Sequence, residues 1–188
     1  MEVVSDIDEL NTREKELYGY GMSHRVYPSK KNSDVLYKIG EIETVRKWVD
    51  VFKSNPKIFP VVYKVGDIKM PLKNFRGEVI KYYPARYVMI EKLDNKRAEN
   101  DFKLIDKFFD KHHPDGYDFH MSIIDFEDEG DTLSDMGELM FKLDTNLFNV
   151  YIKFIKLILE LHKIKKYPDL HIGQFGYDKK NNLKCLDF

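Results

Sequence analysis

One stretch near the end of the chain decides the expected fold: Asp169-Leu170-His171-Ile172-Gly173-Gln174, followed by Leu186-Asp187-Phe188. The two aspartates are 18 residues apart. Between them, 175–186 is typical of two short strands around the polar turn 178–182. The order of a loop carboxylate, a hairpin and a second carboxylate singles out Asp169 and Asp187 as candidate functional residues.

Composition sets the class of protein. The 188 residues are 43% hydrophobic and 14% aromatic, enough for one domain or two small lobes with a core. Because 31 basic residues balance 32 acidic ones, we expect no direct nucleic-acid binding. The single Cys185, the lack of an apolar run of about 20 residues and the acidic N-terminus favour a cytoplasmic protein without membrane contact.

In the first half of the chain, residues 18–94 are predicted to form mostly strands. The expected strands are 25–27, 35–39, 59–65 and 86–90, with a polar excursion at 73–81. A helix from Glu41 to Pro56 places Val45, Trp48, Val49 and Phe52 on one face. Residues 1–17 form an N-terminal extension, either a short helix or a tail.

Residues 95–188 read mostly as helices. The helical ranges are 97–109, 133–143 and 148–162, with the terminal hairpin after them. In the last helix, the expected core stripe is Phe148, Tyr151, Ile152, Ile155, Ile158, Leu159 and His162. The sequence therefore predicts an α+β chain with a β-rich first lobe and a helical second lobe, divided near 91–94.

A glycine turn opens the first lobe. Gly19, Gly21, Ser23 and Val26 follow the pattern G-x-G-x-x-x-x-V, and glycines let main-chain N–H groups approach phosphates. His24 stands where such loops often carry a third glycine. A plain β-turn explains the same residues.

Lys38 lies inside the apolar strand 35–39, where an inward-pointing lysine would be unusual. The alternative is a lysine on a solvent-exposed face. Glu41 falls in phase with the apolar face of the following helix and could pair with Lys38, with Glu43 as the substitute. Glu41 could equally be a first-turn acid stabilised by the helix dipole.

Two other polar clusters were weighed. Asp110, His112, His113, Asp115 and His120 match no strong metal-ligand spacing, so a metal site there is disfavoured. The acidic run 127–135 is most simply a solvated loop, although it could meet a basic partner.

Taken in order, these motifs resemble the protein-kinase-like superfamily, and most closely the short serine/threonine kinases of podovirus-type bacteriophages. The resemblance covers about residue 18 to the end and rests on 19–23, 36–40, 60–63, 87–91, 169–174 and 186–188. It implies a two-lobed kinase-like fold with an abbreviated, mostly helical C-lobe. Gln174 replaces the family's metal-binding asparagine, and Tyr167-Pro168 replaces His-Arg.

The resemblance also implies roles. Lys38 and the glycine turn would hold the phosphates of ATP, and the main chain of Glu91 to Leu93 would bind the adenine edge with Ile90 behind it. An ordinary strand end explains 87–91 equally well. Asp169 would orient the substrate hydroxyl, and Gln174 and Asp187 would hold Mg²⁺.

The expected function is that of a viral-type ATP- and Mg²⁺-dependent serine/threonine protein kinase acting on host proteins. The alternative is a pseudokinase that binds a host or virion protein, with apolar surface on the shortened C-lobe that favours oligomers. A third reading, a small-molecule phosphotransferase, is argued only from His171.

Overall fold

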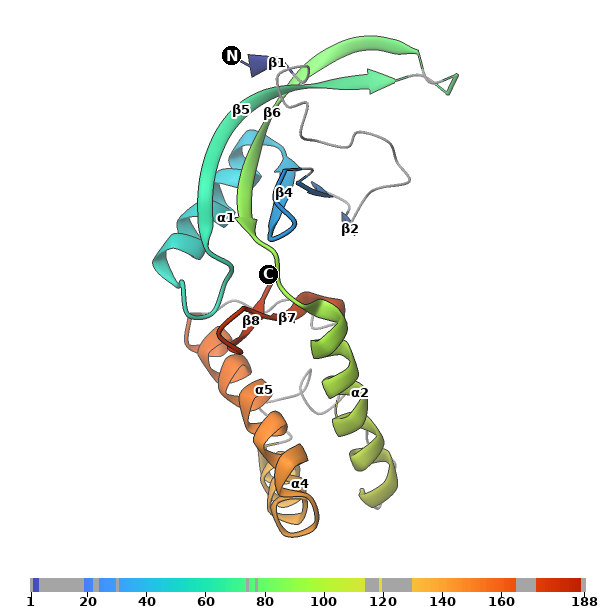
Figure 1. The fold of residues 1–188 in the computed structure, drawn as a ribbon, viewed down its shortest axis with the longest axis vertical. Coiled ribbons are helices and arrows are strands. Elements are labelled where there is room, and N and C mark those ends of the chain that lie inside the picture. Colours follow the sequence, from blue (N-terminus) through green and yellow to red (C-terminus); the bar gives the residue numbers. More distant parts are fainter. Residues whose placement is uncertain are drawn as a thin grey trace. The chain divides into compact units, whose positions relative to one another are not determined.

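The computed structural model describes residues 2–3, 19–21, 24–29, 31–73, 75–76, 78–113, 119, 130–164 and 172–186 (Figure 1). Its mixed helices and strands confirm the α+β prediction. The chain divides into two compact units. Unit 1 comprises Met1–Pro56 and Pro60–Lys92, and unit 2 comprises Lys57–Phe59 and Leu93–Phe188.

Unit 1 is built on a sheet of six strands in the order β1-β5-β6-β4-β3-β2. Only β1 and β5 pair in parallel; the other pairs are antiparallel. The strands are β1 (Glu2–Val3), β2 (Gly19–Gly21), β3 (His24–Pro28), β4 (Val35–Gly40), β5 (Val62–Lys73) and β6 (Val79–Glu91).

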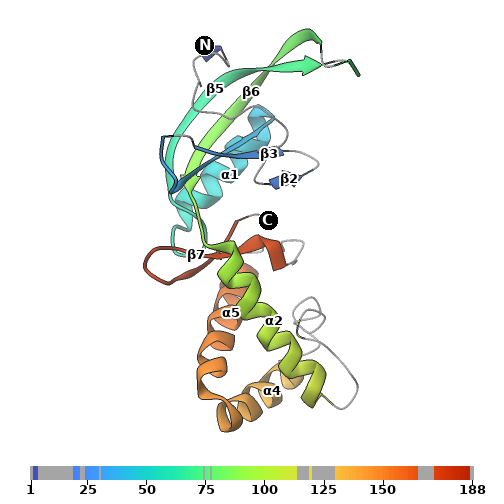
Figure 2. The same cartoon turned by 45° about the vertical axis from the view of Figure 1, so that its right-hand side comes forward.

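The β5–β6 hairpin is much longer than predicted. In Figures 1 and 2, the two strands run side by side as a long curved ribbon. The range 73–81, expected to be a polar excursion, lies at its distal end, where Lys73 pairs with Val79. The sequence estimate was too short because the outer ends of the two strands, Leu72 and 79–82, are exposed and so lack the alternating apolar pattern of a half-buried strand.

Helix α1 (Ile42–Ser54) packs on one face of this sheet. Its buried residues are Val45, Trp48, Val49 and Phe52, which confirms the predicted face. Neighbouring side chains on a strand point to opposite faces. Accordingly a second cluster, on the face opposite Lys38, contains Tyr27, Tyr37, Ile39, Ile68, Met70, Ala85 and Tyr87.

Gly66 makes room within that second cluster. It pairs directly with Tyr87, and a Cβ atom at Gly66 would lie 2.7 Å from the Tyr87 ring. The Tyr87 ring in turn packs at 5.8 Å, centroid to centroid, against Tyr37. Because Gly66 has no side chain, the Tyr87 ring can lie across the main chain of Gly66 on the neighbouring strand.

Unit 2 combines helices with a small hairpin. The helices are α2 (Asn95–His112), α4 (Gly130–Leu143), α5 (Thr145–Lys163) and the short 3₁₀ helix η3 (Ile172–Gln174). Strands β7 (Phe175–Tyr177) and β8 (Leu183–Cys185) form the predicted terminal hairpin. Asp94 and Asp144 cap α2 and α5 by accepting hydrogen bonds from the amides of Arg97 and Leu147, at 3.0 and 2.9 Å.

An aromatic core joins these elements. Phe102 of α2 lies with its ring centroid 5.1 Å from Phe119, 5.6 Å from Phe154 of α5 and 6.4 Å from Phe175 of β7. The buried face of α2, formed by Ala98, Phe102, Ile105 and Phe109, agrees with the prediction.

The buried face of α5 differs from the predicted stripe. The helix buries Tyr151, Phe154, Leu157, Ile158 and Leu161. Phe148, Ile152 and Ile155 are only partly buried, and Leu159 is 40% exposed. Because α5 is apolar on two sides, periodicity alone could not decide which side faces the core.

The segment Lys57–Phe59 groups with unit 2, although it lies within the range 18–94 that the sequence assigned to one lobe. The amide of Cys185 donates a 2.8 Å hydrogen bond to the carbonyl of Ile58, and Phe59 is fully buried. Unit 2 is therefore discontinuous in sequence.

Within the described residues, no helix has the length and apolar character needed to cross a membrane.

Candidate functional site

The glycine turn forms a tight hairpin in unit 1. Gly19 pairs with Val26 and Gly21 with His24, so β2 and β3 are joined by the two residues 22–23. That connection, including the predicted phosphate ligand Ser23, lies outside the described residues. The described strands place Gly21 next to this connection and Gly19 at the other end of β2, opposite Val26.

Lys38 points inward, so the solvent-face alternative is wrong. Its side chain is 2% exposed, and its Nζ lies 4.0 Å from the centroid of the Trp48 ring and 6.0 Å from that of Phe52. Lys38 pairs with Val26 on one side and Val88 on the other, so these side chains share a face of the sheet. Burying an ammonium group is costly, and the Trp48 ring offsets part of that cost by a cation–π contact.

Neither candidate glutamate lies on the buried face of α1. Glu41 is exposed and precedes the helix as its N-cap residue, in an extended conformation with φ −61° and ψ 146°. Counting it as a helical residue placed it in phase with Val45, and that expectation is corrected here. Glu43 is also exposed, with Oε1 3.8 Å from a guanidinium nitrogen of Arg46.

The predicted adenine-binding segment follows β6. Ile90 is 1% exposed. The amide of Glu91 donates to the Val61 carbonyl at 2.9 Å, and the amide of Lys92 donates to the Asp34 carbonyl at 2.8 Å. Among the described residues, no hydrogen bond involves the main chain of Leu93. Leu93 is therefore the position in this segment with both a donor and an acceptor to offer.

In unit 2, the residues after Lys92 hold the segment around Gln174. The side chain of Leu93 packs on Gly176, where an added Cβ would lie 2.5 Å from the Leu93 Cβ. The Asn95 side chain donates to the carbonyls of Gly173 and Phe175, at 3.3 and 2.9 Å. Pairing between Asp94 and Tyr177 completes this attachment.

Gln174 carries a buried oxygen with no donor. The residue is 8% exposed, and its Oε1 has no hydrogen-bond partner among the described residues. Buried polar atoms are nearly always satisfied, and an amide oxygen is a ligand that Mg²⁺ accepts. The Oε1 atom of Gln174 could therefore serve as a ligand of a cation. Asp169, His171 and Asp187 lie outside the described residues.

Other metal sites were sought in the described part of the chain. No group of three His, Cys, Asp or Glu side chains gathers there. Of the cluster at 110–120, His112 lies on α2 with its ring 4.5 Å from that of Phe108, and Asp115 and His120 fall outside the described residues.

The turn of the terminal hairpin is ordered by Asp178. Its carboxylate accepts hydrogen bonds from the amides of Lys180 and Asn182, at 2.9 and 2.8 Å, and lies 3.5 Å from Nζ of the buried Lys184. Burial by itself raises the pKa of the Asp178 carboxyl, but the bonds from Asn182 and the charge of Lys184 outweigh it, so the pKa is below its ordinary value.

Tyr177, the last residue of β7, is held by a second polar network, which involves residues of α2. Its hydroxyl donates to Asp101 at 2.8 Å, and the Arg97 guanidinium lies 4.4 Å from its ring centroid. Burial, together with the bond to Asp101, raises the pKa of the Tyr177 hydroxyl. Both networks stabilise the hairpin next to Gln174.

No protein-family model matches this chain, and no curated protein has a matching sequence.

Sequence reasoning missed the contact of Leu93 with Gly176 and the Asp178–Lys184 pair. The sequence signal for the Asp178–Lys184 pair was the presence of two opposite charges at the two ends of the turn, next to the apolar residues of the hairpin strands. The first carried no sequence signal, since it joins residues that are 83 positions apart.

Proposed function

We propose that this chain is an ATP- and Mg²⁺-dependent serine/threonine protein kinase of viral type, with a two-lobed kinase-like fold, acting on host proteins in a bacterial cytoplasm. The observation that carries the proposal is the buried Lys38, which lies over Trp48 and beside the strand of the glycine hairpin. Lysine side chains are almost never fully buried unless they are paired, so a lysine that is 2% exposed is a candidate for a functional site.

The proposed roles follow from the groups that the residues offer. The Lys38 ammonium neutralises phosphate charge, and the main chain of Leu93 bonds to the adenine edge. Gln174 and Asp187 would hold Mg²⁺, which supplies positive charge next to the phosphates. Asp169 orients the substrate hydroxyl and accepts its proton as the oxygen bonds to the γ-phosphorus and ADP leaves.

A thermal-shift titration with Mg²⁺–ATP tests the nucleotide site. Ligand at about 100 times its Kd stabilises a protein by about 2.7 kcal/mol, which raises Tm by several degrees at this size. We expect the shift in the wild-type chain and not in Lys38→Met. The matched control is Lys47→Met, an exposed lysine of α1, which should keep the shift. An equal shift in Lys38→Met would refute the role of Lys38.

Phosphoryl transfer is tested separately. Asp169→Asn should keep the Mg²⁺–ATP shift and lose transfer to a serine- or threonine-containing acceptor, because only the orienting carboxylate is removed. Transfer at the wild-type rate would contradict the assignment.

The second candidate is a pseudokinase that acts by binding. Two altered motif positions favour it, because Gln174 stands where the resembled family has a metal-binding asparagine and His24 stands where it often has a third glycine. The absence of any shift at millimolar Mg²⁺–ATP would support this candidate over the kinase.

A further inference from the structure

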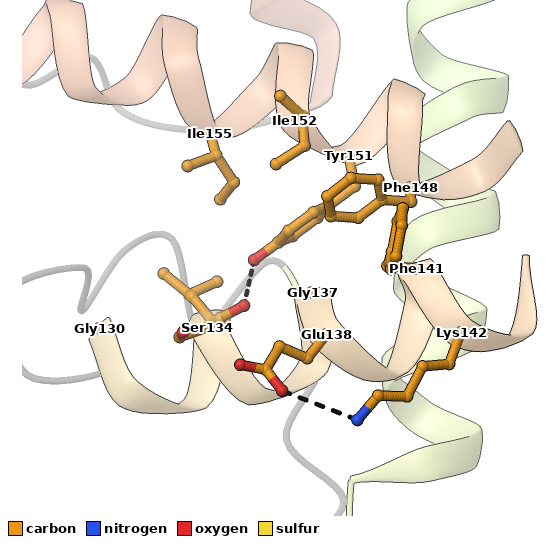
Figure 3. Close-up of a pocket in the computed structure, with 11 residues that line it drawn as sticks. Gly130, Ser134, Gly137, Glu138, Phe141, Lys142, Phe148, Tyr151, Ile152 and Ile155 are labelled. Carbon is orange, nitrogen blue, oxygen red and sulfur yellow. Dashed lines mark hydrogen bonds and ion pairs between the residues drawn. The ribbon is translucent and has the colours of Figure 1, made fainter. Parts of the chain in front are cut away.

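An apolar groove runs between α4 and α5 of unit 2 (Figure 3). It encloses about 610 Å³, and its apolar walls are Leu133, Phe141, Phe148, Tyr151, Ile152 and Ile155. The Tyr151 hydroxyl points from α5 toward α4 and donates to the carbonyl of Leu133 (Figure 3). Since that group is satisfied within the chain, the groove offers a partner apolar contact.

The α5 side of this groove has the spacing of a helix–helix seam. Phe148, Ile152, Ile155 and Leu159 follow one another at intervals of 4, 3 and 4 residues. This is the spacing by which two helices pack along a shared apolar seam. Among the described residues, the core of unit 2 buries the other side of α5, and the four seam residues remain partly or largely exposed.

The edges of the groove differ in the charges that no described ion pair uses: an acid on α4 and a lysine on α5. On α4, the exposed Asp131 and Glu138 are seven residues apart and lie along the same edge. On α5, the exposed Lys156 and Lys163 are likewise seven residues apart. Each follows a seam residue by four positions, Lys156 after Ile152 and Lys163 after Leu159, so both lie along one edge of the seam. Glu138 pairs with Lys142, which also lines the groove, at 3.7 Å, and Lys163 pairs with Glu160 at 2.6 Å. No ion pair between described residues uses Asp131 or Lys156, so these two are the charges left for a partner.

We propose that this groove is the interface of a homodimer. In a two-fold dimer, a contact from α4 to α5 of the second copy is repeated from α5 to α4. The acidic edge of each α4 then meets the basic edge of the partner's α5, and the open seams bury one another. A second copy fits both the apolar seam and the two charged edges, and this inference does not depend on the proposed kinase activity.

Sedimentation equilibrium of the full chain from about 1 to 100 µM tests the interface. We expect a mass approaching twice the 22.4 kDa of one chain. Ile152→Glu should shift the chain to monomer, because it places a charge in the seam. The matched control Leu104→Glu, at a position of α2 that is 54% exposed and away from the groove, should remain dimeric.

A charge exchange tests the edges without touching the apolar walls. Asp131→Lys and Lys156→Glu should each raise the dimer Kd about tenfold, because each places like charges together at two symmetric contacts. The double variant should restore the wild-type Kd to within about threefold. A wild-type chain that stays monomeric at 100 µM, as expected if the groove takes a different protein or a small apolar ligand, would overturn the proposal. A double variant no tighter than either single variant would also overturn it.

Discussion

At the scale of single residues, packing decides which groups can act. Lys38 and Lys47 are both lysines of unit 1, but only Lys38 is buried against Trp48. Gln174 is distinguished in the same way, because its Oε1 is buried without a donor. Neither property follows from residue type, since both depend on which side of an element faces the interior.

Replacement of Gly176 should lower the stability of the chain. Gly176→Ala would place a Cβ 2.5 Å from the Cβ of Leu93, an atom close to the main chain that has little freedom to move. We expect the free energy of unfolding to fall by about 1–3 kcal/mol, measured by urea denaturation followed by far-UV circular dichroism.

Gly130→Ala is the matched control for Gly176→Ala. A Cβ at Gly130, the first residue of α4, meets nothing within 4 Å. This substitution should stabilise the chain by about 0.4–1 kcal/mol, through the lower entropy of the unfolded state. Equal effects of the two alanines would contradict the packing of Leu93 on Gly176.

At the scale of elements, each helix or strand combines a local pattern with a tertiary role. Helices α1 and α2 each carry one apolar face, and both faces are buried as their periodicity predicts. Helix α5 carries two: described residues of unit 2 bury one of them and leave the other partly exposed. The β7–β8 hairpin is short, so its stability depends on the side chains of its turn.

The hairpin turn should make stability depend on pH. The pKa of Asp178 is lower in the folded chain than its ordinary value of about 3.9, so its contribution is present above about pH 4 and is lost as pH falls through the folded pKa. Asp178→Asn should therefore lose less free energy of unfolding than the wild type between about pH 6 and pH 3.

Asn182→Ala is the companion variant for this pH experiment. It removes the 2.9 Å bond from the Asn182 side chain to Asp178 and leaves the main-chain bond in place. Its pH dependence should lie between those of the wild type and Asp178→Asn. Superimposable pH profiles for all three proteins would show that Asp178 does not carry this dependence.

At the scale of the whole molecule, the two units share one chain that passes between them more than once. Unit 2 includes Lys57–Phe59, which lies between two segments of unit 1. Trp48, the single tryptophan, reports on unit 1, whereas most of the described helical residues belong to unit 2. Trp48 fluorescence can therefore follow the unfolding of unit 1, and far-UV circular dichroism can follow mainly that of unit 2.

Phe59→Ala should destabilise unit 2, although Phe59 lies between α1 and β5 in sequence. Its fully buried ring would leave a cavity, which costs about 3–5 kcal/mol. In urea, we expect the far-UV dichroism transition to move to lower concentration while the Trp48 fluorescence transition stays in place. Ile68→Ala, at a buried position of unit 1, should produce the opposite pattern. Coincident shifts of both probes in each variant would show that the units unfold as one.

The sequence by itself determined the elements whose signals are local. The buried faces of α1 and α2 follow from a period of 3.6 residues, and the terminal hairpin follows from a polar turn between short apolar runs. It also singled out Lys38, the glycine hairpin and Gln174 as candidates.

Only the tertiary structure decided the rest. It turned the Lys38 side chain inward, extended β5 and β6, and left one side of α5 partly exposed. Each of these depends on a partner distant in sequence, as Leu93 depends on Gly176. Periodicity states that a face is apolar, whereas the free energy of packing selects which other segment covers it.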